Sequence, residues 1–211
     1  MLRRAFLLAA AAPAGAALAQ ANLRPDPTPR LPPQPGQGLP LDDRRFLRDA
    51  AALSAAQAEA AARAAQAAGD EETRGFATAL AARHRDLGGR IAALVQGEGG
   101  AGATGLDGEA PGGRVAEALR RLERAAAPGA EPARDFLATQ IEVHPVLVEL
   151  YQTQASHSTS RELGRFAITT LVGVQEDFAA AVRLGARHGL APPQGLLANP
   201  PQYGPGAGPP R

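Results

Sequence analysis

Helical periodicity dominates the chain from Leu41 to Gly189, and it limits what this sequence can fold into. Apolar residues in this region recur at intervals of three and four positions, which is the spacing of one face of an α-helix. No stretch alternates apolar and polar residues for long enough to predict a strand. We expect helices to begin near Asp42, Asp70, Arg114, Pro132 and Thr159. The sequence therefore predicts an all-α fold, an antiparallel four-helix bundle with a short extra helix in the middle connection.

Two Pro-rich segments flank the helical region. Residues 22–40 and residues 190–211 both contain many prolines, which block helical hydrogen bonding and favour extended conformations. We expect the first segment to be a linker and the second to be a disordered tail. Residues 41–189 then form the bundle domain.

The first 21 residues have the pattern of a signal peptide. Arg3 and Arg4 precede an apolar stretch of small residues that ends in Ala17-Leu18-Ala19, the A-x-A pattern of a cleavage site. The stretch is shorter than the roughly 20 apolar residues that span a bilayer, so we expect no transmembrane anchor after processing. The paired arginines fit either the Sec or the twin-arginine route. The sequence predicts a periplasmic or secreted protein.

Composition excludes several kinds of chemistry. The 211-residue chain contains neither Lys nor Cys, so all 22 basic residues are Arg. A P-loop lysine, a Schiff-base lysine, a thiolate nucleophile and a Cys zinc site are therefore all absent from the sequence. The net charge is +1, and there is no basic run and there are only 2 Tyr and 6 Phe to stack on bases, so we expect no nucleic-acid partner. No nucleophile elbow is present either, which favours a non-enzymatic role.

Four polar residues fall on the apolar stripes of the long helices. His84 and His144 each interrupt such a stripe at helical spacing, and both should face the interior. Asp177 does the same on the last helix, and Gln57 on the first. One polar residue from each long helix is a pattern that bundles use for metal sites or polar cores.

Two interpretations of this polar core stay open. In the first, the side chains hydrogen-bond to one another without any ligand. In the second, His84, His144 and Asp177 bind zinc or iron with an open coordination position, and Gln57 is their polar neighbour. A di-iron carboxylate site is not predicted, because it requires Glu three residues before His and no His here has one.

The chain also resembles the domain-of-unknown-function 4142 family of exported bacterial proteins. The resemblance covers about residues 43–184 and rests on Asp43, Phe46-Leu47, Ala50-Ala51, Ala64, Phe76-Ala77, His84, Gln140, His144, Leu163, Phe166-Ala167, Thr170-Leu171 and Gln175-Glu176. It implies a ferritin-like four-helix bundle and an exported compartment, but no reaction. Members usually carry Glu, Asp and His at the positions of Gln57, Arg83 and Asp177, so three polar positions differ in this chain.

These observations together predict an exported helical bundle that acts as a non-enzymatic binding or envelope-associated module. The alternative is a metal-binding ferritin-like protein that uses the His84, His144 and Asp177 site. No motif specifies a protein or envelope partner.

Overall fold

The computed structural model describes residues 39–97, 109–125, 129–191 and 193. All of these residues belong to one compact unit. The predicted signal peptide, nearly all of the linker and the tail from residue 194 lie outside the described residues. Their predicted character is therefore not addressed by the structure.

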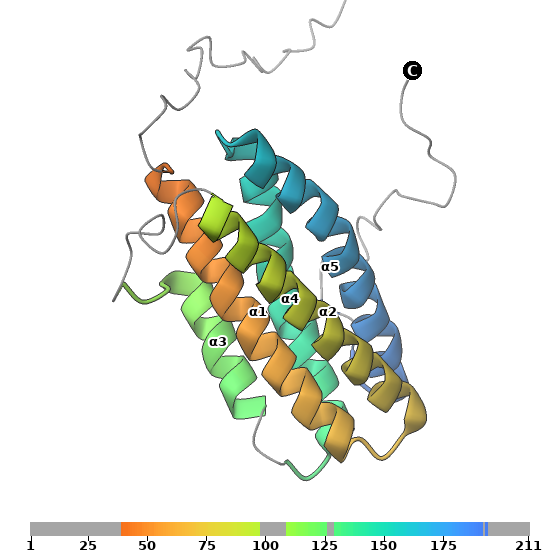
Figure 1. Cartoon of the computed structure of the whole chain (residues 1–211). Coiled ribbons are helices and arrows are strands. Elements are labelled where there is room, and N and C mark those ends of the chain that lie inside the picture. Colours follow the sequence, from red (N-terminus) through yellow and green to blue (C-terminus); the bar gives the residue numbers. More distant parts are fainter. Residues whose placement is uncertain (1–38, 98–108, 126–128, 192, 194–211) are drawn as a thin grey trace, which may run out of the picture. The chain divides into compact units, whose positions relative to one another are not determined.

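Five helices and no strand make up the described residues, so the predicted all-α class is confirmed (Figure 1). The helices are α1 (Leu41–Ala67), α2 (Glu71–Gly97), α3 (Gly113–Ala125), α4 (Pro132–His157) and α5 (Arg161–Arg187). Their starts agree with the predicted ones to within two residues. None of the described helices is both long enough and apolar enough to cross a membrane.

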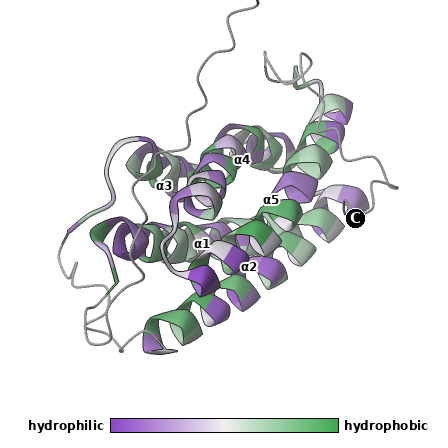
Figure 2. Ribbon diagram, turned by 90° about the horizontal axis from the view of Figure 1, so that it is seen from above, coloured by the Kyte–Doolittle hydropathy of each residue, from purple (hydrophilic) through white to green (hydrophobic). Residues whose placement is uncertain are grey.

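The helices pack unequally on one another. α1 packs mainly against α2, and α4 packs mainly against α5, while α3 lies against both α1 and α4 (Figure 1). By contrast, α2 and α5 contact each other at few positions. Each helix carries both hydrophobic and hydrophilic residues, as amphipathic packing requires (Figure 2).

The core consists of two apolar clusters along the bundle. One contains Phe46, Leu47, Leu147, Tyr151 and Phe166, where the Phe46 and Tyr151 rings meet edge to face with centroids 5.5 Å apart. The other contains Ala61, Ala64, Ala77, Leu80, Ala81, Phe136 and Leu137. Small alanine side chains line much of the α1 and α2 contact in this second cluster, which lets the two helices approach closely.

A buried carboxylate ties the beginning of α1 to the turn between α4 and α5. Asp43 is 3% exposed and accepts hydrogen bonds from Gln154 Nε2 at 2.6 Å, Ser158 Oγ at 3.1 Å and Thr159 Oγ1 at 3.2 Å. Because Thr159 is engaged with Asp43, the side chain that caps α5 is Ser160, which accepts from the Leu163 backbone N–H at 3.3 Å. The capping residue of α5 therefore lies one position after Thr159, the residue that the sequence predicts at this place.

Candidate functional site

A layer of buried polar side chains separates the two apolar clusters. It contains Gln57 of α1, His84 of α2, Gln140 and His144 of α4, and Asp177 of α5, and we call these five residues the polar layer. On α2, Leu80 of one cluster precedes His84 and Leu87 of the other follows it, and on α4, Leu137 precedes Gln140 and Leu147 follows His144. The four side chains that the sequence assigns to the interior are all buried, and Gln140 is a fifth that sequence reasoning placed only through the family resemblance.

His144 is held in one tautomer by the backbone of its own helix. Its Nδ1 lies 2.9 Å from the Gln140 carbonyl oxygen, which can only accept, so Nδ1 carries the proton. Burial lowers the pKa of His144 to about 4, an effect that the Gln140 hydrogen bond opposes and Arg83 reinforces. The ring is therefore neutral at pH 7, and Nε2 is a buried lone pair with no partner among the described residues.

His84 is the second neutral imidazole of the layer. Only 3% of the residue is exposed, and burial lowers its pKa to about 3, with further lowering from His144 and from Arg83. The His84 Nδ1 atom is buried and has no hydrogen-bond partner in the described part of the chain.

The amide groups of the polar layer are also unsatisfied. Both polar atoms of the Gln57 side chain and both of the Gln140 side chain are buried without a partner among the described residues. Buried polar side-chain atoms usually have a partner, so a cluster of unpaired ones needs an explanation such as bound water, an ion or a ligand. The interior thus has hydrogen-bonding capacity that its own side chains leave unused.

Asp177 has a partner, but not the predicted one. Arg83 of α2 donates two hydrogen bonds to its carboxylate, one from Nε to Oδ2 at 3.0 Å and one from its terminal nitrogen to Oδ1. Burial raises the pKa of Asp177, and the contact with Arg83 opposes that rise. Arg83 and Asp177 therefore form one ion pair between α2 and α5.

The structure thus buries both His84 and His144 and engages Asp177 with Arg83. Across the described ranges, no group of three His, Asp or Glu side chains is arranged to hold a metal ion. The predicted ligand set of His84, His144 and Asp177 is not assembled in this conformation.

A cleft opens beside the polar layer, between α2 and α5. It has a volume of about 450 Å³, within the range of small-molecule sites. His84 and Thr170 line its inner wall, and the Thr170 hydroxyl is buried without a partner among the described residues. We call this cavity the α2–α5 cleft.

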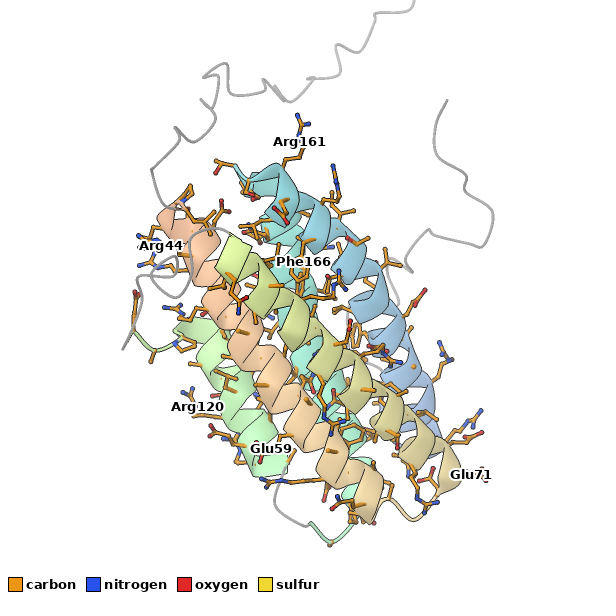
Figure 3. The ribbon with its side chains drawn as sticks, in the orientation of Figure 1. Arg44, Glu59, Glu71, Arg120, Arg161 and Phe166 are labelled. Carbon is orange, nitrogen blue, oxygen red and sulfur yellow. The ribbon has the colours of Figure 1, made fainter. Side chains whose placement is uncertain are left out.

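Phe166 lies between α2 and α5, while Glu59, Arg120 and Arg161 point outward from the bundle (Figure 3).

Sequence reasoning missed the cleft. The available signal was the run of small and hydroxylated residues on α5, where Thr169, Thr170 and Gly173 all line it. Such residues leave space between two helices that larger side chains would fill. The helical periodicity of apolar residues alone does not identify which two neighbouring helices leave a cleft between them.

The fold and the polar layer define an all-helical bundle protein with a buried polar core. The family described as Domain of unknown function (DUF4142) matches residues 28–184, and the chain belongs to that family. This confirms the resemblance seen in the sequence. No curated protein and no solved structure matches the chain.

Proposed function

We propose that the mature protein is an exported, non-enzymatic binding module that takes a small ligand into the α2–α5 cleft, next to the polar layer. In this proposal the four long helices form an antiparallel, ferritin-like bundle. The pairing of α1 with α2 and of α4 with α5 through short connections supports that topology. The signal-peptide pattern of residues 1–21 supports export.

One observation carries the binding role. His84 and Thr170 line the inner wall of the cleft, and His84 Nδ1 and Thr170 Oγ1 are buried polar atoms that the described residues leave without partners. A buried donor or acceptor without a partner costs about 1–3 kcal/mol. A ligand that supplies those partners therefore binds with a gain that an already satisfied wall would not give.

Native mass spectrometry tests the proposal directly. The chain would be produced with its own first 21 residues, purified from the periplasm, and measured under native and denaturing conditions. We expect a product that lacks residues 1–19 or 1–21, and a native mass that exceeds the denatured mass by one small molecule. Equal native and denatured masses, or a product that retains Met1, would contradict the proposal.

A matched pair of variants places the ligand. Thr170→Val removes the buried hydroxyl at nearly constant volume, and we expect it to lower the bound fraction. Thr139→Val is the control, because the Thr139 hydroxyl is exposed on α4 and donates to the Asp135 carbonyl of its own helix. Equal loss of ligand in both variants would place the site elsewhere.

A specific observation also supports a second candidate, metal binding by the two histidines. His144 Nε2 is a buried lone pair, His84 Nδ1 is unpartnered, and both rings are neutral at pH 7, which is the protonation state that metal ligands need. Zinc or iron would require further ligands, since Asp177 is paired with Arg83.

Metal analysis separates this candidate from the first. For the wild type, we expect added zinc to raise the melting temperature and a chelator to reverse the rise, because a ligand of the folded state stabilises it. His144→Ala should abolish the zinc response, while His157→Ala, an exposed control on the same helix, should keep it. A melting temperature that ignores zinc, iron and chelator would eliminate the metal candidate.

A further inference from the structure

The charges of the side chains that line the α2–α5 cleft sum to zero, but only two of these side chains form an ion pair with each other. Arg83, Asp86, Arg90 and Asp177 line the cleft, so it contains two positive and two negative side chains. Arg83 and Asp177 form an ion pair between α2 and α5. Arg90 and Asp86, both on α2, have no ion-pair partner within the described residues.

Arg90 turns toward α5 instead of toward Asp86. These two residues are one helical turn apart, a spacing at which an acid and an arginine can pair on a helix surface. The guanidinium carbon of Arg90 lies 5.1 Å from the centroid of the Phe166 ring, a cation–π contact that bridges the two helices. Both charged groups are therefore left available to a molecule in the cleft, and all five hydrogen-bond donors of the Arg90 guanidinium are unused by protein acceptors in the described structure.

The wall of the cleft between these charged groups is apolar except for two polar side chains. Leu87 and Val174 are 6% and 5% exposed and line the cleft, as do His84 and Thr170 with their unpartnered atoms. An occupant complementary to this surface has an apolar body, one anionic group and one cationic group. A dianion or a dication would leave an unbalanced charge in a cleft whose own net charge is zero.

We propose that the α2–α5 cleft binds a small zwitterion with an apolar body, such as an apolar α-amino acid. The carboxylate pairs with Arg90, the ammonium group pairs with Asp86, and the apolar body lies on Leu87 and Val174. This inference rests on the proposed function, because it names the ligand class of the same cleft.

Three probes of nearly the same shape test the charge pattern by calorimetric titration of the mature chain. They are L-phenylalanine, 3-phenylpropionate, which lacks the ammonium group, and phenethylamine, which lacks the carboxylate. We expect L-phenylalanine to bind about tenfold or more tightly than either singly charged probe, because each of those loses one charge-assisted contact. Equal affinities for L-phenylalanine and 3-phenylpropionate would overturn the inference.

Two variants assign the charges to residues. Arg90→Gln should weaken L-phenylalanine and 3-phenylpropionate about tenfold and leave phenethylamine unchanged. Asp86→Asn should weaken L-phenylalanine and phenethylamine and leave 3-phenylpropionate unchanged. Arg85→Gln is the matched control, because Arg85 is exposed on α2 and does not line the cleft. All three substituted residues are exposed, so thermal melts of the variants should match the wild type.

The remaining outcomes separate this inference from the proposed function. If a ligand copurifies with the periplasmic protein but none of the three probes binds, the zwitterion inference is overturned and the binding module stands. If no ligand copurifies and no probe binds, both are overturned. Loss of all probe binding in Arg85→Gln would also count against the assignment to Arg90 and Asp86.

Discussion

The two seams between the α1/α2 pair and the α4/α5 pair are closed in different ways. The seam between α1 and α4 is covered by α3, which buries Ala118 and Leu122 against them and adds ion pairs from Arg121 to Glu142 and from Arg114 to Glu149. The seam between α2 and α5 has no such cover in the described structure and leaves the α2–α5 cleft. We call them the covered seam and the open seam.

This difference shows that one bundle can join its helix pairs by apolar packing at one seam and by polar contacts at the other. Apolar packing across the covered seam excludes water and needs a whole extra helix. The open seam is bridged by the Arg83 and Asp177 ion pair and by Arg90 over Phe166, which hold α2 and α5 together at separate points. The α2–α5 cleft, which His84 and Asp177 line, therefore borders the polar layer on the side of the open seam.

The largest expected effect is a loss of stability in acid, which originates in the polar layer behind the open seam. The pKa of His84 is lowered to about 3 and that of His144 to about 4, so below the ordinary value of 6.5 the unfolded chain binds more protons than the folded one. Stability should therefore fall as pH drops below 6.5, and continue to fall to about pH 4 for His144 and about pH 3 for His84. Between pH 7 and pH 5 we expect a loss of about 2 kcal/mol for each ring.

Urea unfolding at pH 7, 6 and 5 measures this loss. A chain with His84→Gln and His144→Gln should show a much flatter pH dependence than the wild type over that interval. His157→Gln serves as the control, because His157 is exposed. An unchanged slope in the double variant would mean that the two imidazoles do not control acid stability.

The next largest effect compares the two seams by cavity formation. Leu122→Ala should cost about 2–5 kcal/mol, because Leu122 is fully buried where α3 covers α1 and α4. Val174→Ala, which removes less volume beside a cleft that is already open, should cost less. The midpoint of urea unfolding gives both values. A larger loss for Val174→Ala would reverse the proposed roles of the two seams.

The smallest effect concerns the ion pairs that cross the seams. Arg83→Ala should cost about 1–2 kcal/mol, because it leaves the partly buried Asp177 carboxylate without its partner. On the covered seam, Arg114→Ala should cost under about 1 kcal/mol, since Arg114 and Glu149 are both exposed. Thermal melts at low and high salt measure both. A chain with Arg83→Asp and Asp177→Arg should recover most of the Arg83→Ala loss, and failure to recover it would show that the pair acts through more than its charges.

Periodicity in the sequence was sufficient to predict the five helices and the inward direction of Gln57, His84, His144 and Asp177. These are properties of single helices, in which neighbouring positions determine which face a side chain occupies. The Arg83 and Asp177 ion pair joins residues that are 94 positions apart, and it depends on the rotation of α2 relative to α5. The residue pattern of a single helix does not determine that rotation. We therefore predicted that Asp177 joins the two histidines, and the cleft was not predicted.

Asp43 also constrains the order in which the fold can be completed. Its three hydrogen-bond donors come from residues 154–159, so the beginning of α1 cannot reach its final state before the end of α4 has been synthesised. A ribosome releases the two halves of this contact more than a hundred residues apart, and contacts of such long sequence separation form late in folding. Until then the carboxylate stays in water near the N-terminus of α1, where its negative charge interacts favourably with the helix dipole.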